Sequence, residues 1–154
     1  MARIADETSA ATASFFAIVY RGTQLTALPP GRILRHQALN DIVARAFTST
    51  EKPVLKEPAG LVSGSGKRSD GATSLPWRDG KLIAWDVTVA TTLAESYLAA
   101  SSSRCGSAAE LISARKEAKY HGLPSAYRFI PLAFENLGPQ AQTLTNSSAT
   151  WDDA

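Results

Sequence analysis

The stretch LIAWDVTV, Leu82–Val89, decides the fold of this chain. Its apolar and β-branched residues predict a strand, in which successive side chains point to opposite faces of a sheet. The odd-numbered residues then form an apolar face, whereas Asp86 and Thr88 share the other face with Ala84. Because a carboxylate that leaves water without a partner costs several kcal/mol, Asp86 requires a partner that compensates its charge.

The residues before this strand predict two further strands and a tight hairpin. RDGK, residues 78–81, contains Asp-Gly, the strongest two-residue hairpin signal, and leads directly into Leu82. We expect a short strand in VLKEP, residues 54–58, and another in ATSLPW that ends at Pro76, with a Gly- and Ser-rich turn between them. Antiparallel strands joined in this way would bring Asp70 and Asp86 together at one end of the sheet.

A helix is predicted upstream of these strands. ILRHQALNDIVARAF, residues 33–47, is amphipathic because its apolar residues recur at the helical period. His36 and Asn40 are four residues apart, so they lie along one edge of the apolar stripe.

The C-terminal half predicts one more helix and one more strand. SAAELISARKEAKYHG, residues 107–122, has the pattern of a helix, with Ser107 and Glu110 as a capping box at its start. AYRFIPLAFE, residues 126–135, alternates as a strand does, whereas the Ala- and Ser-rich residues 91–107 predict no element. The resulting order of helix, three strands, helix and strand indicates an α/β fold with a mixed sheet.

Composition excludes several classes of site. The chain has 154 residues, of which 44% are apolar and 19% are charged, as expected for one ordinary globular domain. Its formal net charge of +2 is too small to identify a partner. A single cysteine, Cys105, permits no disulfide within the chain and no cysteine-based zinc site. His36 and His121 are too far apart in the sequence to form a helical metal-binding pair.

The domain boundaries follow from breaks in composition. Residues 1–31 end in Pro-Pro-Gly and look like a leader outside the core, and residues 139–154 form a loose polar tail. The domain is expected to span residues 32–138. The apolar burst at residues 14–20 is too short to span a membrane and lacks the preceding positive charge of a signal peptide. We therefore expect an intracellular protein that is not secreted and has no membrane partner.

Asp70 and Asp86 are the candidate metal ligands. Two carboxylates that are forced together repel each other unless a cation lies between them. Mg²⁺ prefers oxygen ligands and keeps positions for water and phosphate, and Mn²⁺ can substitute for it. The alternative is that Asp70, which precedes Gly71, is an ordinary turn residue.

Five segments together resemble a known nuclease family. They are KRSDG, PWRDG, IAWDVTV, KEAKY and YRFIPLAFE. Across residues 35–138 the chain resembles the PD-(D/E)XK, or restriction-endonuclease-like, family, and more narrowly the endonuclease domains of site-specific non-LTR retrotransposons and related transposon-derived open reading frames. The resemblance implies a core of helix, three-stranded meander, helix and strand, and Mg²⁺-dependent hydrolysis of DNA phosphodiester bonds.

The resemblance also implies roles for individual residues. Asp70 and Asp86 correspond to the two motif aspartates, and the carbonyl oxygen of Val87 would complete the metal coordination. Retrotransposon members carry a K-x-x-x-Y pattern on the helix that follows, and Lys116 and Tyr120 match it. Lys116 is therefore the expected catalytic lysine, which would orient or activate the attacking water.

Further candidates surround this set. They are His36, Glu57, Thr88, Lys119, Tyr120 and Glu135. Thr88 stands where the family motif has a lysine, and Ser69 stands where the family has a proline. Both departures weaken the expectation of catalysis.

Two functions therefore stay open at the level of the sequence. The first is an endonuclease of retroelement origin with DNA as its partner, which would act in the nucleus. The alternative is a catalytically inactive nucleic-acid-binding or interaction module, a decayed or repurposed fragment that keeps the same fold. Retention of DNA without cleavage, weakening as salt rises, would distinguish the second from the first.

Overall fold

The computed structural model describes residues 31–61, 68–77, 80–104 and 106–136. Several predictions concern residues outside these ranges, namely those for the leader, the polar tail, Cys105 and the hairpin residue Asp79. In chain order the described elements are α2 (Arg32–Ser49), β1 (Val54–Lys56), β2 (Gly71–Thr73), β3 (Leu82–Ala90), α3 (Glu95–Ser103), α4 (Ser107–Tyr120) and β4 (Tyr127–Glu135). None of these described helices combines the length and the apolar character needed to cross a lipid bilayer.

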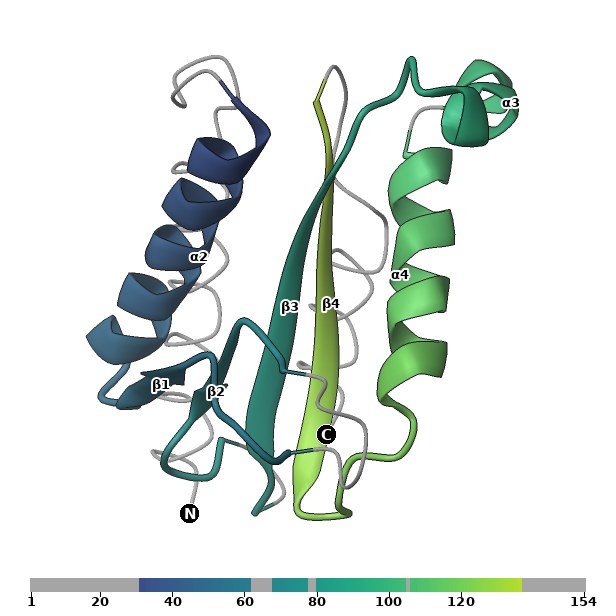
Figure 1. Cartoon of the computed structure of the whole chain (residues 1–154). Coiled ribbons are helices and arrows are strands. Elements are labelled where there is room, and N and C mark those ends of the chain that lie inside the picture. The colour runs from purple at the N-terminus through teal and green to yellow at the C-terminus, as the bar shows by residue number, and fades with distance from the viewer. Residues whose placement is uncertain (1–30, 62–67, 78–79, 105, 137–154) are drawn as a thin grey trace, which may run out of the picture.

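The described strands form one four-stranded mixed sheet in the order β1-β2-β3-β4. β1, β2 and β3 pair antiparallel as a meander, and β4 pairs parallel to β3 along all nine residues. Figure 1 shows α2 on one side of the two long strands and α4 on the other. The predicted α/β fold with a mixed sheet is confirmed.

The α2 face of the sheet holds the larger core. Leu39, Val43 and Phe47 of α2 pack there against the odd-numbered residues of β3, as the alternation of that strand predicts. Trp85 is 0% exposed, and its ring stacks on Phe47 with centroids 4.8 Å apart. A fully buried aromatic pair of this kind fixes the distance between α2 and the sheet.

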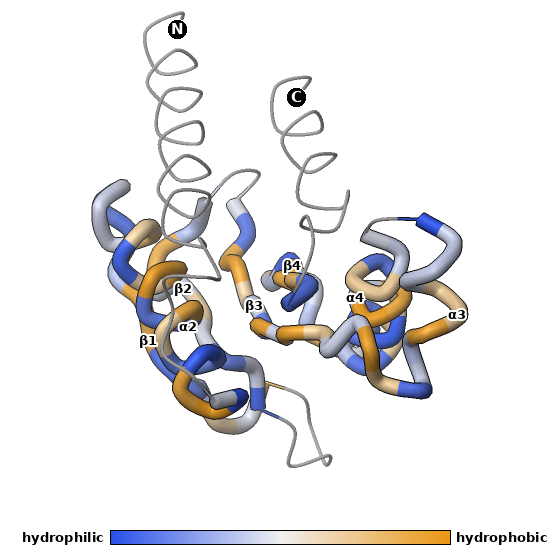
Figure 2. The backbone as a smooth tube through the Cα atoms, turned by 90° about the horizontal axis from the view of Figure 1, so that it is seen from above, coloured by the Kyte–Doolittle hydropathy of each residue, from blue (hydrophilic) through white to orange (hydrophobic). Residues whose placement is uncertain are grey.

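The α4 face holds a smaller core made mostly of alanine. Its buried members are Ala90, Ala108, Ala109, Ile112 and Ala133. Small side chains at a packing contact allow a helix to approach its neighbour closely. Seen from above, α3 and α4 lie together on the side of β3 and β4 that is opposite α2 (Figure 2).

The structure corrects two of the predicted elements. Residues 95–103, to which no element was assigned, form α3, and β2 covers only Gly71–Thr73 instead of the longer run to Pro76. None of the residues of α3 is fully buried, although Tyr97 packs half-buried against the α4 core. A helix with so little buried surface leaves a weak apolar periodicity in the sequence.

The predicted capping box of α4 is also wrong. The Ser107 hydroxyl donates to the carbonyl of Arg104 at 2.6 Å, and Glu110 forms an ion pair with the Arg104 side chain. The cap is instead supplied by Glu135, whose buried carboxylate accepts from the backbone N–H groups of Gly106, Ala108 and Ala109 at 3.0–3.3 Å. A carboxylate at this position satisfies N–H groups that the helix itself leaves unpaired.

Candidate functional site

Asp70 lies where β2 begins, and its carboxylate turns toward α2. The ladder pairs Gly71 with Trp85, yet the Asp70 N–H also donates to the Trp85 carbonyl at 3.0 Å, so two residues of this segment oppose one residue of β3. Oδ2 of Asp70 accepts from the Val87 N–H at 2.6 Å and lies 3.0 Å from Nε2 of His36. The carboxylate therefore takes the place of a ladder partner for Val87.

Asp86 lies on the opposite face of β3, under α4. Its side chain is almost fully buried, and the residue is 5% exposed. Nζ of Lys116, on α4, forms an ion pair with Oδ2, although the contact lacks hydrogen-bond geometry. Oδ1 lies 3.1 Å from the hydroxyl of Tyr120. Asp86 thus has Lys116 as its charge partner and the Tyr120 hydroxyl as a polar neighbour.

The Tyr120 hydroxyl joins both carboxylate-bearing segments. It lies 2.5 Å from the carbonyl oxygen of Arg68 and 3.1 Å from Oδ1 of Asp86, and it accepts from Nζ of Lys119 at 3.2 Å. A hydroxyl has one proton, so it donates to Arg68 or to Asp86 at any moment. The ring of Tyr120 stacks on Phe129 with centroids 4.3 Å apart, which holds the hydroxyl in place.

The pKa shifts show that the two carboxylates act on the same groups. Burial, followed by the charge and the hydrogen bond of Asp86 and the charge of Asp70, raises the pKa of Tyr120. The hydrogen bond to Asp70 raises the pKa of His36, against an opposing effect of burial, and the charges of Asp70 and Asp86 add to the rise. Tyr120 therefore remains a protonated donor near neutral pH.

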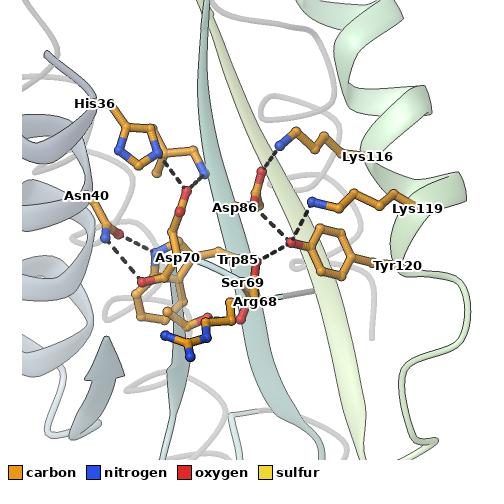
Figure 3. A network of polar contacts seen from close by, with 12 residues as sticks. His36, Asn40, Arg68, Ser69, Asp70, Trp85, Asp86, Lys116, Lys119 and Tyr120 are labelled. Carbon is orange, nitrogen blue, oxygen red and sulfur yellow. Dashed lines mark hydrogen bonds and ion pairs between the residues drawn. The ribbon is translucent and has the colours of Figure 1, made fainter. Parts of the chain in front are cut away.

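Figure 3 shows the resulting arrangement across β3. Asp70 points toward His36 on the α2 side, and Asp86 points toward Lys116 and Tyr120 on the α4 side. The prediction that the two carboxylates come together at one end of the sheet is therefore not confirmed, because the alternation of β3 turns Asp86 away from α2. Within the described ranges, no group of three or more His, Cys, Asp and Glu side chains is placed to hold a metal ion. Mg²⁺ sites commonly use only one or two carboxylates, together with water and substrate phosphate. The carboxylate oxygens of Asp70 and Asp86 are donors of the kind that such an ion takes.

Some of the remaining predicted site residues lie beside the two carboxylates, and others lie elsewhere. His36, Lys119 and Tyr120 contact the carboxylates or each other, and Thr88 lies half-buried on the same strand as Asp86. Glu57 follows β1 with an exposed side chain, and its backbone N–H donates to the Asp70 carbonyl. Glu135 lies apart from this set, at the N-terminus of α4.

Asn40 occupies a position whose role the sequence did not indicate. Its Nδ2 donates to the carbonyl of Asp70 at 3.1 Å, and its Oδ1 accepts from Nε1 of Trp85 at 2.9 Å. The four-residue spacing from His36 placed it on the correct edge of α2. The partners themselves come from strands 30 and 45 residues away.

The contact between His36 and Asp70 predicts a dependence of stability on pH. Because the pKa of His36 is raised above 6.5 in the folded chain, its contribution is fully present below the unfolded pKa and is lost as pH rises through the folded pKa. Side-chain exposure of 37% limits the effect to about 1 kcal/mol or less. Urea unfolding in EDTA should show that His36→Gln costs more stability at about pH 5.5 than at about pH 8.5. Equal losses at both values would contradict this assignment.

Comparison with family models and with curated proteins found no match for this chain.

Proposed function

We propose that this chain is a metal-dependent DNA endonuclease domain with a restriction-endonuclease-like core, of retroelement origin. The observation that carries the proposal is Asp86, a carboxylate only 5% exposed that is in contact with the ammonium group of Lys116. Asp70 approaches from the adjacent strand, and Lys116 approaches from the helix above. Carboxylates that could hold a metal ion, with a cationic side chain beside them, supply charge stabilisation of the kind that phosphodiester hydrolysis uses.

The topology supports the same proposal. A helix, a three-stranded antiparallel meander, a helix and a parallel fourth strand follow one another along the chain. This is the order of elements that the resemblance to the PD-(D/E)XK nucleases implies. The additional helix α3 precedes α4, and none of its residues is fully buried.

Each residue has a distinct part in the proposed reaction. Asp70 and Asp86, with the carbonyl oxygen of Val87, would hold Mg²⁺. When bound, such an ion lowers the pKa of a water molecule and stabilises charge on a phosphate. The ammonium group of Lys116 would hold the attacking water or a phosphate oxygen. Since its pKa is raised, the Tyr120 hydroxyl would act as a hydrogen-bond donor and not as a base.

A second candidate function is an inactive nucleic-acid-binding or interaction module. Lys116 already neutralises Asp86, and Asp70 already accepts from Val87 and contacts His36, so both carboxylates have partners within the protein. Thr88 and Ser69 also depart from the family motif. A module of this kind would retain DNA with a strong dependence on salt, without cleavage and without stabilisation by metal.

Thermal unfolding with and without Mg²⁺ or Mn²⁺ separates the two functions. An ion that binds only the folded chain adds about 2.7 kcal/mol at a hundredfold excess over its Kd, which for a chain of this size raises Tm by roughly 5–10 °C. Asp70→Asn should remove the shift. Asp41→Asn, a change in an exposed ion pair with Lys56, should keep it. An unchanged Tm for the wild-type chain in both metals would favour the inactive module.

A further inference from the structure

One side chain of α2 connects both strands that carry the aspartates. The amide of Asn40 donates to the main-chain carbonyl of Asp70 and accepts from the indole N–H of Trp85 (Figure 3). Asn40 is 8% exposed and Trp85 is 0% exposed, so neither group can exchange these partners freely for water. Breaking the bond to Trp85 would leave a buried indole N–H unpaired, which is costly, whereas breaking the bond to Asp70 would leave its carbonyl with the Glu57 N–H alone.

The chemistry of this link requires an amide. The indole N–H is a donor only and needs an acceptor, while the Asp70 carbonyl is an acceptor and needs a donor. An aspartate at position 40 would still accept from Trp85 but would have no proton for Asp70. A leucine would serve neither group.

The link acts on the part of Asp70 that directs its carboxylate. The Asp70 carbonyl also accepts from the Glu57 N–H at 3.1 Å, and the Asp70 N–H donates to Trp85. Together with Asn40, these bonds hold the backbone of Asp70 against α2, β1 and β3. From this backbone the carboxylate reaches the Val87 N–H at 2.6 Å.

We infer that Asn40 is the positioning residue that sets where Asp70 presents its carboxylate. The inference rests on the proposed function insofar as Asp70 is a ligand of the ion. Residues that orient a ligand from behind it change metal affinity or activity by about 10- to 100-fold when they are replaced. The effect of Asn40 on the Asp70 carboxylate does not depend on cleavage, so it can be measured separately.

The first test uses Asn40→Asp in the whole chain and has two readouts. The amide proton of Val87, measured by NMR in EDTA, should move upfield because its short bond to the Asp70 carboxylate lengthens. The Mg²⁺ concentration for half-maximal nicking of supercoiled plasmid should rise about 10- to 100-fold. The matched control is Asn136→Asp. The Oδ1 atom of Asn136 accepts hydrogen bonds from the N–H and the hydroxyl of Thr92, and an aspartate can accept both in the same way. The control should change neither readout.

A second variant tests the role of Asn40 without the negative charge that Asn40→Asp introduces and without an unpaired indole N–H at Trp85. In Trp85→Phe the buried N–H is gone, so adding Asn40→Leu removes only the Asn40 donor of the Asp70 carbonyl, which keeps the Glu57 N–H. A positioning role predicts that the double variant still shows the Val87 shift and the higher Mg²⁺ requirement relative to Trp85→Phe alone. A merely structural role predicts that the double variant matches Trp85→Phe in both readouts.

The outcomes separate the two claims. An unchanged Val87 amide in both Asn40 variants overturns the positioning inference, whether or not the chain cleaves DNA. A wild-type chain that nicks no plasmid counts against the proposed function, and the Val87 amide alone then decides the role of Asn40.

Discussion

Asp86→Asn is expected to abolish Mg²⁺-dependent nicking of supercoiled plasmid, with a loss of about a thousandfold or more. The substitution keeps the shape of the side chain and removes the charge that faces Lys116. Metal-assisted charge stabilisation is worth several kcal/mol, and about 4 kcal/mol corresponds to a factor of a thousand in rate. Initial rates of nicking, compared at equal concentrations of folded protein, measure the effect.

Two controls separate this loss from a loss of the fold. Lys116 has a side chain that is 26% exposed, so its ammonium can turn to water when Asp86 becomes neutral, and thermal unfolding of Asp86→Asn should remain cooperative. Asp41→Asn removes a carboxylate from an exposed ion pair on α2 and should nick at the wild-type rate. Equal nicking by Asp86→Asn and the wild-type chain would remove Asp86 from the reaction.

Gly71→Ala is expected to destabilise the chain by about 3 kcal/mol or more, because β2 and Trp85 leave no room for a methyl group. A Cβ atom at position 71 would lie 2.1 Å from Cζ2 and 2.5 Å from Cε2 of Trp85. The indole is 0% exposed and stacks on Phe47, so it cannot move aside without disturbing the α2 core. Tm should fall by roughly 10 °C.

The chain offers a matched control for this change. Gly122 follows α4 and has no heavy atom within 4 Å of an added Cβ, so Gly122→Ala should leave stability unchanged or raise it slightly. Adding Trp85→Phe to Gly71→Ala should recover part of the loss, since the smaller ring frees space. Additive effects of these two substitutions would show that Gly71 and Trp85 do not compete for the same volume.

Most elements of the fold could be predicted because their signals are local. α2 carries an apolar stripe at the helical period, β3 alternates around Asp86, and β4 alternates between two turns. α3 could not be predicted in this way because none of its residues is fully buried. The cap of α4 could not be predicted because Glu135 follows its nearest partner, Ala109, by 26 residues and reaches it only through the parallel pairing of β4 with β3.

The candidate site was predictable in its members more than in its geometry. Asp70 and Asp86 were identified from the strand pattern, and Lys116 and Tyr120 from the resemblance. In the structure Lys116 and Tyr120 contact Asp86, whereas Asp70 contacts His36 and the Val87 N–H. The side of β3 on which Asp70 lies depends on the two-against-one pairing at Trp85, which turns the carboxylate toward α2. The spacing of residues in the sequence does not predict such a pairing.

The sequence by itself determined which side chains face which side of each element, because side-chain direction follows from the periods of helix and strand. It placed Asp86 opposite the apolar face of β3 and His36 and Asn40 on one edge of α2. Only the tertiary structure decided the partners: Lys116 for Asp86, His36 and the Val87 N–H for Asp70, and Asn40 between the two strands. Those partners depend on how helices and strands distant in the chain pack together, and contacts across such distances are set by the whole core.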